Sequence, residues 1–396
     1  MKKTTLLLMT LAALVSCGKQ TEPLSEQMVH SQMSRCPDAT YLDYTDGRLK
    51  WNYTPGLELR AFLDVYEAYG DQAIYDYVYK WYDAIIAPDG TIGGNYAVDK
   101  YSTDLICPGK SLFYFYDQTG DEKYRKAIET LKTQIDGQPR TQAGAFWHKQ
   151  VYPNQVWLDG VYMAEPFYVE YASRYLEGQA RTEAYDDIVN EFVVAATRTY
   201  DPETKLYRHA WDESESMFWC DPATHGQSLH CWGRALGWYC MALVDVLDWL
   251  PEDYAPRQKL IDILQAICAE LPKWADEKSG VWYQVLDQPG REGNYLESTC
   301  SAMFCFTYLK GVRKGWLDAD LLPYANGLYG DVVREFISTD AEGRISIENC
   351  CSVGGLGGSS NRKGDYEYYL SEPVRPNDSK GVGPFIWASL EMERLK

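Results

Sequence analysis

The chain has 396 residues, of which 45% are hydrophobic and 24% charged, which is enough apolar material for a large folded core. Its formal net charge of −19 argues against a protein that holds nucleic acid by electrostatic attraction. The same charge means that an anionic ligand would need a local cluster of basic side chains to hold it.

The N-terminus has the pattern of an export signal. Lys2 and Lys3 are followed by a short apolar run, and the small residue Ser16 precedes Cys17. The run is too short to span a bilayer, and the four residues that end at Cys17 resemble a bacterial lipobox. We therefore expect residues 1–16 to be a lipoprotein-type signal peptide, and Cys17 to anchor an exported protein in the periplasm or cell envelope. The alternative is an ordinary secretory signal peptide that is cleaved without lipid attachment, in which case the cysteine at position 17 is a coincidence.

Ten cysteines remain after Cys17, and export would permit disulfides among them. Five lie in apolar runs of helical character, where a free thiol packs as a small hydrophobic group: Cys231, Cys240, Cys268, Cys300 and Cys305. No pair has the spacing of a zinc site. We expect neither a metal ion nor a cofactor.

Two classes of helical segment then alternate along the chain. Apolar, aromatic segments, which often begin at a glycine, cover residues 56–69, 108–118, 160–176, 233–250, 299–311 and 383–394. Amphipathic segments cover residues 72–86, 122–135, 183–200, 257–275 and 321–337. Residues 17–37 read as a tether with a possible first helix from Glu22 to Pro37, which makes six of each class.

This alternation predicts an all-α fold, an (α/α)6 barrel of six helical hairpins formed by residues 38–396 as a single catalytic domain. The apolar helices would form a buried inner ring and the amphipathic helices an outer ring with one wet face. An open helical solenoid is the alternative. Strand signals are few, as at residues 280–285, and the glycine-rich residues 354–363 are expected to form a loop over the mouth of the barrel.

Asp159 is the first candidate for chemistry. It stands among Trp157, Leu158 and Val161, just before the third apolar segment. Poor solvation there would raise the pKa of the carboxyl group and make it a proton donor. The plain alternative is that Asp159 only caps the helix that follows.

Other polar and aromatic residues are expected at the same end of the barrel, because the N-termini of the inner helices share one mouth. They precede or open the inner segments, or follow the outer ones: Asp104, His148, Lys149, His209, Trp211, Trp232, Arg234 and Trp238. Carboxylates, aromatic rings and a few bases at one opening are typical of a carbohydrate cleft. Taken singly, each His and Trp could be structural, and Arg234 could pair with a core acid such as Asp245.

Two motifs carry a resemblance to a known family. Residues 157–164, Trp-Leu-Asp-Gly-Val-Tyr-Met-Ala, and residues 232–238, Trp-Gly-Arg-Ala-Leu-Gly-Trp, resemble family 105 of the glycoside hydrolases, the unsaturated rhamnogalacturonyl hydrolases. The likeness runs from about Tyr53 to the C-terminus and extends to the related unsaturated glucuronyl hydrolases. It implies that Asp159 is the general acid and base and that Asp104 is the second acid of the site.

The resemblance further implies substrate contacts by His148, Lys149, His209, Trp232, Arg234 and Trp238. Three residues depart from the family's pattern: Leu105, Ala235 and Glu165, and the last bears on the identity of the substrate. The expected activity is removal of a 4,5-unsaturated uronic acid from the non-reducing end of lyase-generated oligosaccharides, by hydration of the vinyl ether double bond. A polysaccharide lyase and a non-catalytic glycan-binding lipoprotein are the alternatives. The expected partner is the unsaturated oligosaccharide, with membrane contact only through the lipid anchor.

Overall fold

A computed structural model describes residues 22–43 and 48–395 of the chain. The expected signal peptide and Cys17 lie outside the described residues, so both stay predictions. Within the described part, no helix is long and apolar enough to cross a bilayer.

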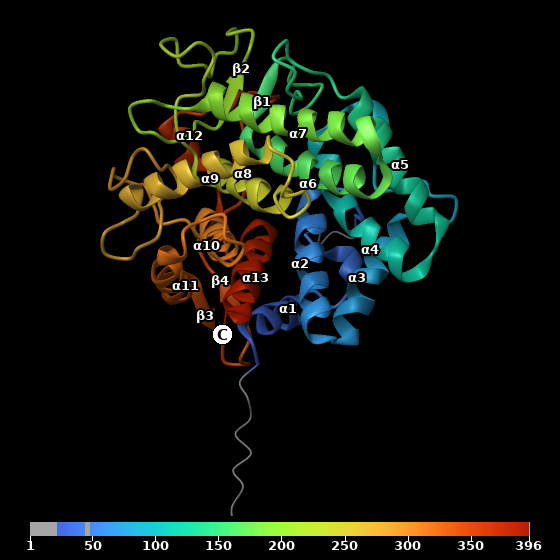
Figure 1. Ribbon diagram of the computed structural model, residues 1–396. Helices are drawn as coiled ribbons and strands as arrows, with labels where there is room; N and C mark the ends of the chain where they lie inside the picture. Colours follow the sequence, from blue (N-terminus) through green and yellow to red (C-terminus); the bar gives the residue numbers. More distant parts are fainter. Residues whose placement is uncertain (1–21, 44–47, 396) are drawn as a thin grey trace, which may run out of the picture.

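Six helices form a closed inner ring (Figure 1). They are α2 (Tyr53–Tyr69), α4 (Lys110–Thr119), α6 (Leu158–Tyr175), α8 (Gly233–Val246), α10 (Ser298–Arg313) and α13 (Ser379–Arg394). Each packs on the next, with the short turn η4 (Cys107–Gly109) completing the contact of α4, and α13 packs back on α2. This closure confirms the (α/α)6 barrel and excludes the open solenoid.

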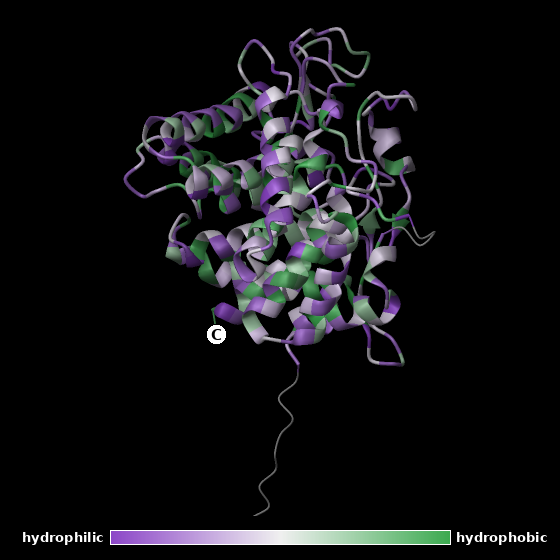
Figure 2. Ribbon diagram, turned by 90° about the vertical axis from the view of Figure 1, so that its right-hand side faces the viewer, coloured by the Kyte–Doolittle hydropathy of each residue, from purple (hydrophilic) through white to green (hydrophobic). Residues whose placement is uncertain are grey.

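Six outer helices surround this ring: α1 (Leu24–Arg35), α3 (Gln72–Ile85), α5 (Glu122–Gly137), α7 (Gly178–Thr199), α9 (Arg257–Glu270) and α11 (Leu322–Phe336). Helix α3 shows why they lie outside. Its buried residues Ile74, Tyr77, Val78 and Trp81 recur at helical spacing on one face, and polar residues occupy the other. The inner helix α8 is instead buried along nearly its whole length. Hydrophilic residues accordingly gather on the outward side of the helices (Figure 2).

Short strands connect the hairpins in three antiparallel pairs: β1 (Gln155–Trp157) with β2 (Ala210–Asp212), β3 (Ile337–Thr339) with β4 (Ile345–Ile347), and β5 (Cys350–Cys351) with β6 (Val374–Arg375). The strand expected at residues 280–285 is not formed. Tyr283 and Val285 make only isolated bridges there, to Leu296 and Trp232, because each faces a different partner segment.

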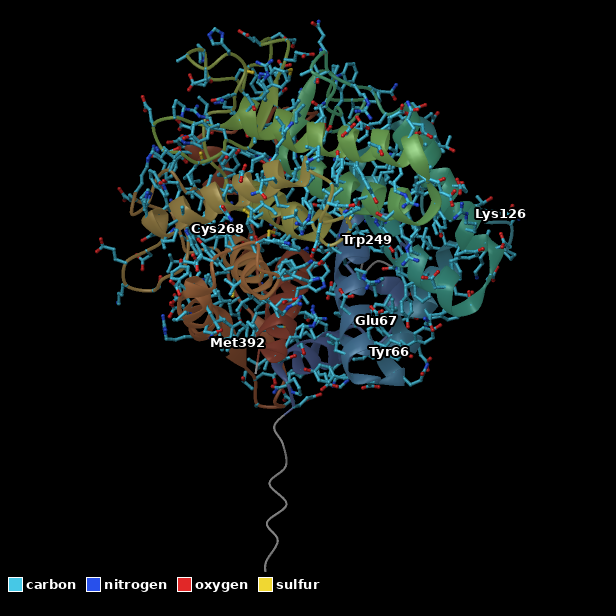
Figure 3. All side chains as sticks on the ribbon, in the orientation of Figure 1. Tyr66, Glu67, Lys126, Trp249, Cys268 and Met392 are labelled. Carbon is cyan, nitrogen blue, oxygen red and sulfur yellow. The ribbon has the colours of Figure 1, made fainter. Side chains whose placement is uncertain are left out.

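The C-terminal ends of the inner helices enclose a cavity of about 540 Å³ opposite the predicted mouth. Two of its lining residues, Glu67 and Trp249, are labelled in Figure 3. Its charges are largely paired with one another, as between Arg60 and Glu67 at 2.8 Å and between Lys310 and Asp245 at 2.8 Å. Arg60 and Glu67 both belong to α2, whereas the pair of Lys310 on α10 with Asp245 on α8 ties two neighbouring inner helices together at the closed end of the barrel.

Glu165 lies in the interface between α6 and the outer helix α7, away from the mouth. It is fully buried, and neither of its carboxyl oxygens has a hydrogen-bond partner among the described residues. Burial, followed by the nearby Glu191 and Asp187, raises the pKa of Glu165 well above its ordinary range, and Arg140 offsets this only in part. Burial also raises the pKa of Glu191 to about 8. The departure from the family's pattern at Glu165 therefore affects the packing of two helices, and the Glu165 side chain does not contact the predicted substrate site.

A protonated Glu165 predicts a pH-dependent stability. The unfolded chain ionises this carboxyl above its ordinary pKa of 4.5 while the folded protein keeps it protonated, so stability falls as pH rises above that value. Glu165→Gln removes the titration, and we expect its advantage in unfolding free energy to grow by up to about 1.4 kcal/mol per pH unit in that range. Denaturant melts of both proteins at pH 5 and pH 8 measure this, and an advantage that does not change with pH would contradict it.

Candidate active site

Asp159 lies inside the first turn of α6 and does not cap it. The helix begins at Leu158, and its cap residue is Trp157. The Asp159 side chain is 13% exposed, and its Oδ2 atom is 3.2 Å from Nε2 of His209. That buried oxygen accepts no well-formed hydrogen bond from a described residue. Helix capping therefore does not account for this carboxylate.

The pairing of β1 with β2 brings His209 to Asp159. Trp157 faces Ala210 in the register of the two strands, and the Leu158 N–H donates to the carbonyl oxygen of His209 at 3.1 Å. This pairing therefore places the start of α6, which carries Asp159, beside His209, the residue before β2. His209 is completely buried there, and its Nδ1 lies 2.8 Å from the hydroxyl of Tyr369.

Asp104 forms a second group with Lys149 and His148. It lies in the short turn η3 (Thr103–Leu105), 13% exposed, with Oδ2 at 2.5 Å from the Lys149 Nζ and Oδ1 at 3.7 Å from the His148 Nε2. The Thr103 N–H donates to the His148 carbonyl at 3.0 Å, which fixes the two loops together. A Cβ at Gly160 would stand 2.9 Å from the His148 Nδ1, so the glycine lets this histidine reach the start of α6.

Stacked rings form one wall of this site. The ring of Trp157 stacks against His148, at a centroid distance of 4.6 Å, and against Tyr152, at 5.2 Å, and these two rings are themselves 6.4 Å apart. The glycine-rich loop closes over them, because Leu356 is fully buried in a cluster with Trp157. This placement agrees with the predicted loop over the mouth.

Arg234 lies in the first turn of α8 and is almost fully buried. Its guanidinium stands 4.7 Å from the ring of Trp232 and donates to the carbonyl oxygen of Cys351. Glu297 fixes that carbonyl by accepting the Cys351 N–H at 2.8 Å. Arg234 does not pair with Asp245, which binds Lys310 instead. Among the described residues no carboxylate lies within ion-pair distance of Arg234.

The two remaining tryptophans lie differently. Trp238, one turn along α8 from Arg234, packs between Tyr162 at 4.8 Å and Tyr53 at 6.3 Å and forms the floor of the site. Trp211 points to the other face of β2, where its Nε1 donates to the carbonyl of His225 at 3.0 Å and its ring packs under Arg198. Adjacent strand residues face opposite sides, so Trp211 lies away from the Asp159 cluster.

The pKa of Asp159 differs from the sequence-based expectation. Burial does raise it, but the attraction of His209, with smaller contributions from His148 and Arg234, outweighs burial and lowers the pKa of this carboxyl below its ordinary value. Burial, together with Lys149, lowers the pKa of His148 to about 4, so that imidazole is neutral near pH 7. The expected rise in pKa was wrong because the sequence showed only the apolar neighbours of Asp159.

The sequence did not point to Tyr152 of the stacked wall, nor to two further tyrosines of the site. Tyr369, in α12 (Tyr366–Ser371), contacts His209, and Tyr53, at the first position of α2, lies near both Asp104 and Asp159. Tyr53 could have been found, because it opens an inner helix as Arg234 does. Tyr369 gave no such signal, because its helix belongs to neither ring.

The assembled site can transfer a proton and bind an anion. Asp159 is a single buried carboxylate with an imidazole at 3.2 Å, and Arg234 is a buried cation without an anionic partner among the described residues. Aromatic rings enclose both, and the N-termini of α6 and α8 favour negative charge nearby.

Comparison with known proteins identifies relatives over nearly the whole described chain. The sequence profile of Glycosyl Hydrolase Family 88 matches residues 24–396. A solved family 105 glycoside hydrolase of C. acetobutylicum ATCC 824 is 41% identical, with a TM-score of 0.89, over 94% of this chain and 100% of that one.

Two curated relatives are also similar. Protein Atu3128 of Agrobacterium fabrum is 36% identical over 58% of this chain and 97% of its own length. The unsaturated rhamnogalacturonyl hydrolase YesR of Bacillus subtilis is 27% identical over 70% of this chain and 74% of its own.

Proposed function

The chain belongs to family 88 of the glycosyl hydrolases, and from this premise we propose that it removes a 4,5-unsaturated uronic acid from the non-reducing end of lyase-generated oligosaccharides. Membership makes it a glycoside hydrolase, and the name of YesR supports unsaturated uronides of the rhamnogalacturonyl type. The observation that carries the proposal is the single carboxylate of Asp159, buried beside His209 and free of any capping role.

The reaction requires one residue that first gives and then takes a proton. Asp159 donates its proton to C4 of the double bond, and positive charge develops at C5 and the ring oxygen. Asp159, then ionised, takes a proton from the water that attacks C5. The resulting hemiketal opens and releases the remaining sugar. This sequence needs no second carboxylate as nucleophile, unlike the acid pair of ordinary glycosidases.

The lowered pKa of Asp159 describes the enzyme without substrate. In that state the attraction of His209, whose Nε2 is 3.2 Å from Oδ2, favours the ionised form of Asp159. A substrate brings its own carboxylate, and we expect that anion to bind Arg234. Neutralising this cation removes one of the attractions that keep Asp159 ionised. Substrate binding therefore favours the protonated form of Asp159, which is the form that the reaction requires.

Incubation with oligosaccharides made by lyases from pectin, glycosaminoglycan and algal polysaccharides tests the function. The ultraviolet absorbance of the conjugated double bond falls if the enzyme hydrates it. Absorbance that rises on intact polymer would indicate a lyase, and a flat trace with measurable binding would indicate a glycan-binding protein.

Asp104 has a different role from Asp159, because its ion pair with Lys149 balances its charge. Asp104→Asn leaves that lysine unpaired beside the site, and we expect slower turnover and a basic limb of the pH–rate profile lower by about half to one unit. The double variant Asp104→Asn with Lys149→Met should restore the limb. If the basic limb does not move in Asp104→Asn, the role of Asp104 would be limited to hydrogen bonding.

We further propose that the protein is exported and held to the cell envelope by a lipid on Cys17. Support comes only from the sequence of residues 1–17. Labelling of growing cells with a radioactive fatty acid should mark the wild-type chain and leave Cys17→Ala unmarked. Equal labelling of both would contradict the anchor.

A further inference from the structure

Tyr369 holds the far side of the imidazole that faces Asp159. His209 is completely buried, with Nε2 directed at Asp159 and Nδ1 at 2.8 Å from the Tyr369 hydroxyl. Among the described residues this hydroxyl is the hydrogen-bond partner of Nδ1. The orientation of the ring is therefore set by one contact on each side.

Tyr369 is itself rigidly placed. Its ring is fully buried and stacked on Trp232 at 5.8 Å with an interplanar angle of 20°, and its carbonyl accepts from the side chain of Gln284 at 3.3 Å. Asp365 caps the short helix α12 by accepting the Tyr368 N–H at 2.9 Å. A hydroxyl held in this way can either donate to or accept from Nδ1 without moving.

We propose that Tyr369 is a positioning residue for the reaction, which directs His209 so that its Nε2 stabilises the Asp159 carboxylate that remains after the proton has gone to C4. This inference rests on the function proposed above. Tyr369 acts through His209, because its hydroxyl contacts the imidazole and its ring packs on Trp232.

The proton count shows why a hydroxyl is suited to this position. When the pair holds a proton, either as imidazolium with carboxylate or as imidazole accepting from a carboxylic acid, Nδ1 carries a hydrogen and Tyr369 accepts it. When the pair has lost its proton, Nε2 carries the remaining hydrogen toward Asp159, and Tyr369 donates to Nδ1. One O–H group satisfies both states by rotation, which a backbone carbonyl could not do.

The surrounding charges come from several elements. Asp159 on α6 faces His209 directly, and His148 and Arg234 act on the same carboxylate from the preceding loop and from α8. The backbone N–H of His209 donates to the backbone carbonyl of His230. The ring of His230 in turn pairs with Asp287 at 2.9 Å. These groups are all present in a Tyr369→Phe variant, so the comparison isolates the hydroxyl.

Tyr369→Phe keeps the ring that stacks on Trp232 and removes only the partner of Nδ1. We expect kcat to fall about 10- to 100-fold with little change in KM, because the ring of His209 is no longer aligned. Hydrogen bonds to a charged group are about twice as strong as neutral ones, so the protonated pair loses more than the deprotonated pair. The basic limb of the pH–rate profile should therefore move down by about half to one unit.

Tyr239→Phe is the matched control. Tyr239 on the inner helix α8 is equally buried, and its hydroxyl donates to a backbone carbonyl, that of Phe192, at 2.8 Å. Both variants lose one buried hydroxyl, and their melting temperatures should fall by similar amounts. A pH profile that moves equally in both, or in neither, would overturn the positioning role.

Nitrogen-15 spectra of histidine-labelled enzyme provide a readout that does not depend on substrate. The chain has five histidines, and the signal pair of His209 is identified as the one that is lost in His209→Gln. In the wild type above the basic limb, we expect the hydrogen of His209 on Nε2, with the Nδ1 shift of a hydrogen-bonded acceptor. Tyr369→Phe should shift Nδ1 to the position of a free acceptor.

A wild-type spectrum with the hydrogen on Nδ1 at high pH would overturn the inference, as would an Nδ1 signal unchanged by Tyr369→Phe. Failure of the proposed function would appear instead as wild-type enzyme that never lowers the absorbance of unsaturated oligosaccharides. The two failures are therefore distinguishable.

Discussion

Asp159→Asn is expected to lower turnover by about a hundred- to ten-thousandfold, with folding and substrate binding preserved. The amide has the shape of the carboxyl group and fits the same space beside His209, but it cannot deliver a proton to C4. Because Asp159 does not cap α6, the exchange should cost the helix little. Initial rates of absorbance loss on an unsaturated oligosaccharide measure the effect, and calorimetric titration of the variant measures binding.

Asp245→Asn is a suitable control for that experiment. Asp245 also belongs to an inner helix, but it pairs with Lys310 at the closed end of the barrel. This variant should retain nearly full activity. An Asp159→Asn enzyme of near wild-type activity would end the assignment of the general acid.

Much of the fold could be predicted because the signal is repeated. Each of the six hairpins pairs a segment buried on nearly all sides, such as α8, with one buried on a single face, such as α3. Six weak patterns in alternation support one another. The strand expected at residues 280–285 failed for the opposite reason, since a short apolar run does not specify its partner.

The site could be predicted in part, for the residues that open inner helices or precede them. Asp159, Arg234 and the Asp104–His148–Lys149 group depend on the chain positions that the barrel brings to one mouth. The direction in which a side chain points could not be predicted in the same way. Trp211 is close to His209 in the sequence, but its side chain lies on the other face of β2. The sign of the pKa change at Asp159 also depends on His209, fifty residues away, whose approach is set by the β1–β2 pairing.

Arg234→Met is expected to raise KM by two or more orders of magnitude for the charged substrate. A buried guanidinium without a carboxylate at ion-pair distance is costly, and its hydrogen bond to the Cys351 carbonyl supplies no full negative charge. The carboxylate of the uronide would supply the missing anion in a setting from which Trp232 excludes water. Methionine preserves much of the side-chain volume, so the melting temperature should change little.

A methyl-esterified uronide separates binding of the anion from support of the fold. The ester carries no charge, so Arg234→Met should lose little on it relative to the wild type. Arg140→Met, which removes a guanidinium paired with Asp187 outside the mouth, controls for the loss of a positive charge from a strongly acidic protein. An equal loss on charged and esterified substrates, or a large fall in melting temperature, would place Arg234 in the scaffold through its bond to Cys351. The substrate carboxylate would then be held by Lys149, another cation at the mouth, and relief of its pairing with Asp104 would become the step that admits the anion.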